Sequence, residues 1–485
     1  MEPNPWLAGR CIPIQGTLAE GSRGLGLVAG GGYDPAMGSV VPRIETLTRA
    51  MRSDCPVDCR PGGWICVQLA MLLLPSSALL AGLALLAAIT LLRPVAQPSP
   101  LSRPESRWLL LLSVLMLIGS FWAVRGWVAW VGLFNWLPFF WFYLAIQPYL
   151  GTGASRLRLG QWIIAGSVPV IVVTLIQKAV GWSQLLETCW GLIRWPMGDP
   201  AFAAGLFDNP NVTATWLAVT MPFLAGIGLR HRQSLSTRAG AIVITVAASL
   251  ALLINASRNA LATLPVIWAL SCGRRGRIGV LLACLGYGGL VMLKLHQGQE
   301  AALAPLLDLT VPDGLIHKLQ EMGTGTAEGL KYIRRQAIYI AALGYIGRSP
   351  WVGLGENGFG HVYSADLIRL HGELPSSGAV MHSHNLLLEF ALSHGIPALL
   401  LLVTVIGRSL VQAMPMLWGR VQGLDRAWLL ATLVMLWVHL WDLPSFDSRV
   451  NVLDWLLLAA VAVIGRSQTT AEPCQPDARA IDQGR

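Results

Sequence analysis

The segment Met381-His-Ser-His-Asn-Leu-Leu-Leu-Glu389 places ionisable and amide side chains directly before a long apolar run. His382, His384, Asn385 and Glu389 lie at the start of the helix that this run predicts. The first backbone N–H groups of a helix have no partner within it, and the helix dipole favours anions there. A neutral histidine beside an anion site could act as a general base. The alternative is a histidine with a structural role.

Arg258 lies in the short sequence Ala256-Ser-Arg-Asn259, which separates two apolar runs. An arginine kept among lipid chains costs about 3 kcal/mol at a helix centre, and less at the membrane surface. In one interpretation Arg258 lies in a turn and extends to lipid headgroups. In the other, its planar set of N–H donors binds the oxygens of a phosphate.

Two further arginines, Arg334 and Arg335, lie in the segment 330–350, which predicts an amphipathic helix along a membrane surface. The apolar positions that recur at helical spacing are Ile333, Ala337, Ile340, Ala341 and Gly344. Lipid headgroups alone would explain both arginines. The glycines that follow, in 351–360, are not a nucleotide-binding fingerprint because no strand precedes them.

Asn209 and Asn211 flank Pro210 directly before another apolar run. This pattern predicts a turn followed by the N-cap of a helix. Hydrogen bonds from the two amides to a sugar are the functional alternative.

The composition indicates which elements must position these residues. The chain has 485 residues, of which 54% are hydrophobic and only 13% are charged. So little charge is atypical of a soluble globular protein of this length. The apolar residues form blocks of the length that a helix needs to cross a bilayer, and they lack the alternation of barrel strands. We therefore expect an all-α polytopic membrane protein.

About eleven such blocks are visible, and a twelfth span follows if the first block is a hairpin broken at Pro75-Ser76-Ser77. The blocks span 64–92, 108–124, 127–148, 161–180, 212–229, 240–255, 260–272, 278–294, 386–407, 427–441 and 450–465. The net charge of +9 comes from short basic clusters between them, which the positive-inside rule places in the cytoplasm. The charge therefore reports topology, and nucleic acid is not an expected partner.

With basic connections on one side, the unusual polar clusters all fall on the other, non-cytoplasmic side. We expect a disordered N-terminal segment (1–60), a membrane domain (64–465) containing a long periplasmic loop (295–385), and a disordered cytoplasmic tail (466–485). Translation starting at Met51 is a further hypothesis. The scattered cysteines form no metal-ligand pattern, and no metal or cofactor is expected.

Several short motifs in this order resemble the O-antigen ligase and polymerase superfamily of the cell envelope. They are Phe207 to Asn211, Ser257 to Ala260, Arg335 with Tyr339, Pro350 to Phe359, and His384-Asn385 with Glu389 and Gly395. The closing segment 441–451, which contains Arg449, resembles the cyanobacterial subgroup described as related to inorganic-carbon transport. The resemblance covers about residues 64 to 465.

The resemblance implies a metal-independent, inverting glycosyltransferase in the inner membrane. It would transfer a glycan from a polyprenyl diphosphate carrier to an acceptor hydroxyl at the periplasmic face, in lipopolysaccharide or polysaccharide biosynthesis. By position, Arg258 and Arg335 would hold the diphosphate and His384 would be the base. Supporting roles would fall to Asn209, Asn211, Arg334, His382, Asn385, Glu389 and Arg449.

Three alternatives stay open at this point. A bicarbonate transporter could use the same arginines for its anion, although the polar residues gather outside the membrane and no internal repeat is visible. A polysaccharide polymerase would have the same donor site as a ligase. A glycan-binding subunit without catalysis would share its motifs.

Overall fold

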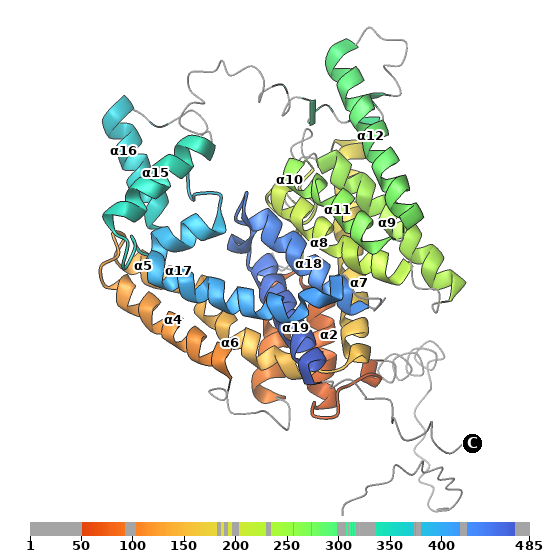
Figure 1. The fold of residues 1–485 in the computed structure, drawn as a ribbon, viewed down its shortest axis with the longest axis horizontal. Coiled ribbons are helices and arrows are strands. Elements are labelled where there is room, and N and C mark those ends of the chain that lie inside the picture. Colours follow the sequence, from red (N-terminus) through yellow and green to blue (C-terminus); the bar gives the residue numbers. More distant parts are fainter. Residues whose placement is uncertain are drawn as a thin grey trace, which may run out of the picture. The chain divides into compact units, whose positions relative to one another are not determined.

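The computed structural model confirms an all-α membrane protein (Figure 1). It describes residues 51–92, 103–181, 186–188, 193–195, 203–228, 234–255, 257–272, 274–297, 307–308, 310–311, 313, 315–316, 320, 335–372, 374, 380–417 and 424–470. Among these residues, seven helices are long and apolar enough to cross a membrane. A small hairpin of β1 (Leu186–Thr188) and antiparallel β2 (Ile193–Trp195) accompanies them.

The helices of the first half are α2 (Pro61–Leu73), α3 (Ala78–Leu86), η1 (Ala87–Leu91), α4 (Pro104–Ser120), α5 (Trp127–Gly132), η3 (Leu133–Asn135), α6 (Leu137–Ile146), η4 (Gln147–Leu150), α7 (Gly153–Val180), α8 (Pro210–Gly228) and α9 (Leu235–Asn255). Those of the second half are α10 (Arg258–Leu261), α11 (Thr263–Ser271), α12 (Arg274–Gln297), α15 (Arg335–Arg348), α16 (Gly358–His371), α17 (Leu386–Ala413), η7 (Met414–Leu417), α18 (Leu424–His439), η8 (Pro444–Phe446) and α19 (Ser448–Thr470).

The first apolar block forms a helical hairpin. Helix α2 ends before Pro75, and Ser77 caps α3 by accepting a hydrogen bond from the N–H of Leu80. Gly63 near the start of α2 lies against the carbonyl of Leu92 directly after η1, so the two arms run antiparallel. The proline and serines therefore mark a turn, as the hairpin interpretation predicted.

A break in α17 shapes the part of the fold above the membrane helices. Gly395 has φ 82° and ψ 168°, so the helix stops and restarts there. The loop 349–357 supplies partners for the interrupted backbone, because the N–H groups of Leu354 and Gly355 donate to the carbonyls of Leu392 and Ser393. In return, the N–H of Ile396 donates to the carbonyl of Pro350. The glycine-containing loop 349–357 thus binds to α17 at its break, and we call it the docking loop.

The docking loop also brings a buried polar side chain against α17. Glu356 Oε2 lies 3.0 Å from His394 Nε2, and both side chains are almost fully buried. Loss of one partner would leave the other buried without it, which is costly. The contact therefore helps to fix the loop to α17.

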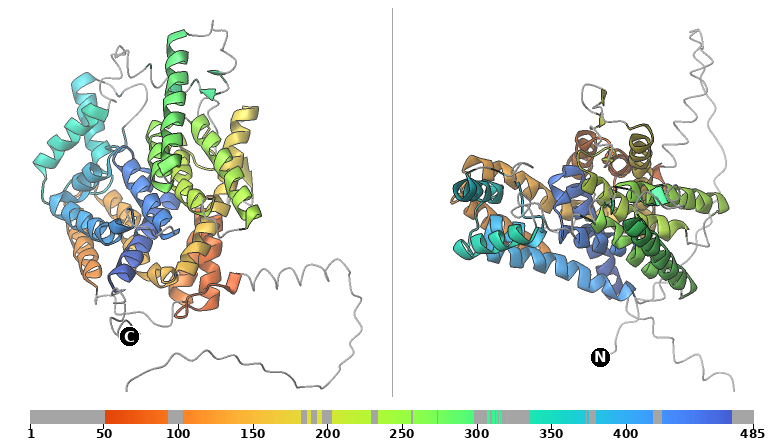
Figure 2. Two further views of the ribbon diagram at one scale, coloured as in Figure 1. Left: turned by 45° about the vertical axis from the view of Figure 1, so that its right-hand side comes forward. Right: turned by 90° about the horizontal axis from the view of Figure 1, so that it is seen from above.

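Helices α15 and α16 form a small layer of their own beside α17 (Figures 1 and 2). The buried face of α15 consists of Ile338, Ala342 and Tyr345, which pack against Phe359 and other apolar side chains of α16. Ile340 of the predicted apolar face is 65% exposed and does not belong to this buried face. Its contact with a membrane surface stays a prediction.

Two predicted boundaries differ from the structure. Residues 51–60 are ordered: Met51 is buried, and its carbonyl accepts a hydrogen bond of 2.7 Å from Gln68 Nε2. Gln68 lies within an apolar helix and needs such a partner. At the other end, α19 continues to Thr470, so residues 466–470 are helical. Residues 1–50 and 471–485 lie outside the described part of the chain.

Candidate active site

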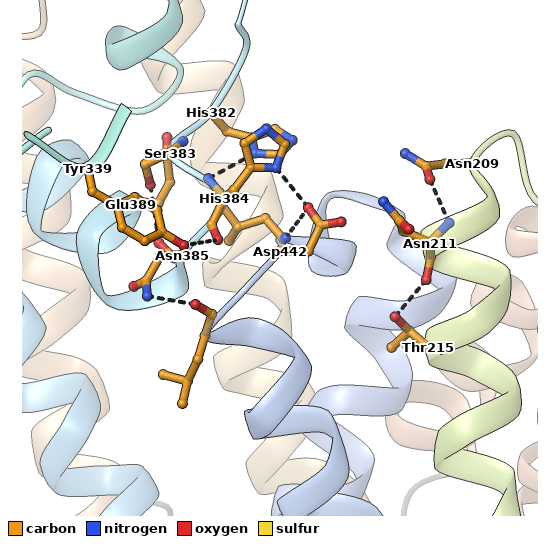
Figure 3. Close-up of polar contacts among 12 residues, drawn as sticks. Asn209, Asn211, Thr215, Tyr339, His382, Ser383, His384, Asn385, Glu389 and Asp442 are labelled. Carbon is orange, nitrogen blue, oxygen red and sulfur yellow. Dashed lines mark hydrogen bonds and ion pairs between the residues drawn. The ribbon is translucent and has the colours of Figure 1, made fainter. Parts of the chain in front are cut away.

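The polar segment before α17 is held by the helix that it precedes. Asn385 is the N-cap, because its Oδ1 accepts the N–H of Leu388 at 3.0 Å. Its Nδ2 donates to the carbonyl of Leu440 at the end of α18, at 2.9 Å. Buried Glu389 accepts the N–H of Ser383 at 2.7 Å. Asn385 and Glu389 therefore position the segment 381–385 (Figure 3).

His384 has an unusual backbone. Its φ is 55°, in the left-handed region that non-glycine residues rarely adopt. Tyr339 of α15 donates its hydroxyl hydrogen to the His384 carbonyl at 3.3 Å. Such conformations persist where the surroundings determine them, and they cluster at functional sites.

The His384 ring pairs with Asp442, which follows α18. The distance from His384 Nδ1 to Asp442 Oδ1 is 3.0 Å (Figure 3). Burial opposes ionisation of Asp442, but the hydrogen bond and charge of His384 keep the pKa of Asp442 below its ordinary value. An ionised carboxylate only accepts hydrogen bonds, so His384 Nδ1 carries the hydrogen. In the neutral ring, Nε2 then has the lone pair that a base needs.

His382 stands beside this pair. Its ring centroid lies 4.3 Å from that of His384 and 5.4 Å from that of Phe446. Burial, helped by His384 and Arg335 and opposed by Asp442, lowers the pKa of His382 to about 4. His382 is therefore neutral near pH 7, and its Nδ1 accepts the N–H of His384 at 3.3 Å.

Arg335 begins the described part of α15, one helical turn before Tyr339, and its charge acts on both His382 and Tyr339. Burial raises the pKa of Tyr339 and the charge of Arg335 opposes this, so the phenol is neutral. Arg334, the other predicted arginine, lies outside the described residues.

Arg258 is exposed at the start of α10, and its placement relative to His384 follows only from the surrounding elements. Asn255 at the end of α9 donates its Nδ2 hydrogen to the carbonyl of Ala203 at 2.8 Å. The loop that starts at Ala203 leads into α8, which packs against η8, directly after Asp442. The loop before Arg258 therefore lies at the same end of the bundle as the histidines. A direct part for Arg258 in the cluster stays a prediction.

Asn209 and Asn211 have the expected local structure. The N–H of Asn211 donates to Asn209 Oδ1 at 2.8 Å, and Pro210 begins α8. Asn209 is thus part of a turn that starts the helix, and this structural interpretation is confirmed. Contacts of either amide with a sugar stay a prediction.

Arg449 anchors the fold. Its Nε lies 2.9 Å from Asp447 Oδ1, and its Nη1 donates to the carbonyl of Leu206 at 2.8 Å. Its guanidinium carbon lies 4.2 Å from the ring centroid of Phe207. These contacts occupy the guanidinium within the protein, so the geometry favours a structural role over phosphate binding.

Asp442 is the residue that sequence reasoning missed as a partner of His384. Its signal was a lone acidic residue at the end of an apolar run, in Trp441-Asp-Leu-Pro444. Nothing in the sequence relates it to a histidine 58 positions earlier. The three elements that bring the cluster together are α15, the start of α17 and the segment after α18.

Comparison with known proteins gives a family-level match for part of the chain. No curated protein matches the chain. Residues 234–403 match the sequence model of the family described as O-antigen ligase, a range that includes Arg258, Arg335, His382 and His384. The match gives no support to the cyanobacterial subgroup. It supports a relation of this multi-span membrane protein to the O-antigen ligase superfamily.

Proposed function

We propose that the protein transfers a glycan from a polyprenyl diphosphate to an acceptor hydroxyl, at the membrane surface that bears His384. The observation that carries this proposal is the His384–Asp442 pair beside Arg335, of which His384 and Arg335 lie within the matched residues 234–403. The pair supplies an oriented base and the arginine supplies positive charge. Transfer from a diphosphate needs both.

The reaction joins the acceptor oxygen to the anomeric carbon and breaks the bond between that carbon and the diphosphate oxygen. His384 Nε2 takes the proton of the acceptor hydroxyl, and Asp442 stabilises the imidazolium that forms. The bonding electrons leave with the polyprenyl diphosphate, whose added negative charge Arg335 and Arg258 stabilise. Base and leaving group on opposite faces of the sugar give inversion at the anomeric carbon.

The location suits a substrate with a lipid tail. The cluster lies where α17 and α18 reach one surface of the membrane domain, and the phosphates of a membrane-borne carrier lie at that depth. We infer that this surface is the periplasmic one, because the basic connections gather at the opposite end. The scheme uses no cofactor and no metal.

The proposal is tested with purified variants, a lipid-linked glycan donor and an acceptor. His384→Ala should lower kcat by about 10²- to 10⁴-fold, since it removes the base. Arg335→Ala and Arg258→Ala should each lower kcat/KM by at least about tenfold. Arg348→Ala, at the exposed end of α15, is the matched control and should retain transfer.

Full transfer by folded His384→Ala would remove His384 from the mechanism. Absence of transfer by the unaltered protein with every donor tested would count against the function itself. Supplying either a lipid acceptor or a second lipid-linked glycan distinguishes ligation from polymerisation.

A further inference from the structure

The cluster contains a set of potential metal-ligand atoms, and the proposed reaction uses two of these residues without a metal. His382, His384 and Asp442 each offer one ligand atom, and these atoms lie within 4.8 Å of one another. Two of the residues come from the segment before α17 and one from the segment after α18. Within the described residues, this is the group of three ligands that could surround one ion.

The donor types favour a particular class of metal. Two imidazoles and one carboxylate suit Zn²⁺ and neighbouring divalent transition metals, whereas Mg²⁺ and Ca²⁺ prefer oxygen ligands alone. Three protein ligands leave a fourth position for water or another ligand, whereas a closed structural zinc site uses four protein ligands.

The geometry is close to that of a bound site. Neighbouring donors of a tetrahedral zinc ion are about 3.4 Å apart, since each bond is about 2.1 Å long. His384 Nδ1 and Asp442 Oδ1 are already 3.0 Å apart. His382 Nδ1 accepts a hydrogen bond of 3.3 Å from the N–H of His384, which is longer than a typical hydrogen bond. A small rotation of His382 would therefore complete the site.

The electrostatics are mixed. The Asp442 carboxylate attracts a cation, while the positive charge of Arg335 acts on the same place. We therefore expect reversible binding that is weaker than in a four-ligand structural site.

We propose that His382, His384 and Asp442 form a reversible site for Zn²⁺ or a similar divalent transition metal, and that the occupied site inhibits glycan transfer. The first part rests on geometry alone; the second rests on the proposed function. A metal bound at His384 Nδ1 displaces the hydrogen from that nitrogen, and the neutral ring then carries its hydrogen on Nε2. In this tautomer Nε2 has no lone pair, so His384 cannot act as the base.

The binding test uses the full-length chain without an affinity tag, in detergent and free of metal. Co²⁺ is the spectroscopic probe, because its visible absorption reports nitrogen and oxygen ligands at low coordination number. We expect one Co²⁺ per chain, displaced by Zn²⁺. His382→Ala and Asp442→Ala should each weaken binding at least tenfold, whereas His361→Ala, on the exposed surface of α16, should not change it.

His382→Gln and a size-exclusion profile of each variant guard against misfolding, since glutamine retains most of the volume of the ring. Absence of Co²⁺ binding would overturn the site. Binding that none of His382→Ala, His382→Gln and Asp442→Ala weakens would overturn it too.

The inhibition test compares each protein with its own metal-free rate. Zn²⁺ should slow transfer by the unaltered chain, and half-inhibition of His382→Gln should need at least tenfold more Zn²⁺. If Co²⁺ binds as expected but Zn²⁺ leaves transfer unchanged or accelerates it, the inhibitory role is wrong and the site stands. If the protein transfers no glycan, the proposed function fails, and the Co²⁺ titration still decides the site.

Discussion

His384 combines two structural features that its sequence context does not predict. Its backbone lies in the left-handed region, and its ring is oriented by a carboxylate from another part of the chain. The pattern His-Asn before an apolar run predicted a histidine at a helix start, and this is confirmed. The tautomer, however, depends on Asp442, and contacts between distant segments are not readable from one sequence.

Asp442→Asn tests the orienting role. An asparagine can offer its N–H to His384 Nδ1 and so stabilise the wrong tautomer, as argued for catalytic triads. We expect kcat to fall by about 10²- to 10⁴-fold. Protonation of His384 to the imidazolium should also become less favourable without the carboxylate, so the acidic limb of the pH–rate profile should change. The measurement is transfer rate across pH 5 to 9. Asp313→Asn, with a side chain that is 88% exposed, is the control. An unchanged rate and profile would reduce Asp442 to a structural residue.

His382 gives a prediction about stability. Its pKa is about 4 in the folded protein against 6.5 ordinarily, so the unfolded chain binds a proton first as the pH falls. The free energy of unfolding should therefore decrease as the pH falls from about 6.5 to 4. Asp442, with a lowered pKa, contributes stability that is lost only below its ordinary pKa of 3.8. Thermal unfolding in detergent at pH 7.5 and 5 should show this decrease, and His382→Gln should reduce it more than His361→Gln does. Equal pH dependence in all three proteins would contradict the assignment.

At the scale of elements, the hydrophobic blocks predicted most helices. Block 278–294 became α12 and block 450–465 became α19, each a little longer than its apolar core. The block 260–272 is different, because it forms only the short helices α10 and α11. Apolar length predicts that a segment is buried in lipid or protein, but whether it crosses alone depends on its neighbours.

The break in α17 is an element-scale feature that composition only partly indicates. Gly395 precedes Ile396-Pro397, a sequence that ends or bends many helices. The partner of the break is 40 residues earlier, where Gly355 donates to the carbonyl of Ser393. The docking loop and the break in α17 therefore form one structural unit. Since its two parts are far apart in the sequence, no local pattern predicts it.

Gly395→Ala should destabilise the protein. A Cβ there would lie 2.4 Å from the carbonyl oxygen of Trp351, and the φ of 82° alone costs a side chain about 1–3 kcal/mol. We expect a lower unfolding temperature in detergent and detachment of the docking loop, seen as faster hydrogen exchange at Leu354 and Gly355. Gly407→Ala, in the same helix with no atom within 4 Å of the new Cβ, should be neutral or slightly stabilising. Comparable stability of the two variants would refute this account of the break.

At the scale of the whole membrane domain, charge predicted which connections share an end. Arg156 at the start of α7 pairs with Asp425 at the start of α18, at 2.7 Å. Arg277, near the start of α12, acts electrostatically on Arg426, near the start of α18, so the starts of these two helices share that end. The polar clusters meet at the other end, where Tyr339 contacts His384. Hydropathy and charge therefore predicted the end of the bundle that holds the candidate site, while the pairings within it came only from the fold.

The first described residues, which start at Met51, contact helix α2. The carbonyl of Met51 satisfies buried Gln68, and the carbonyl of Ser53 accepts a hydrogen bond from Trp64 Nε1 at 3.1 Å. A chain that starts at Met51 should therefore retain its unfolding temperature in detergent, whereas one that starts at Pro61 should unfold at a lower temperature, because each buried donor left without a partner costs about 1–3 kcal/mol. If both truncations unfold at the same temperature, the two carbonyls are not what anchors α2.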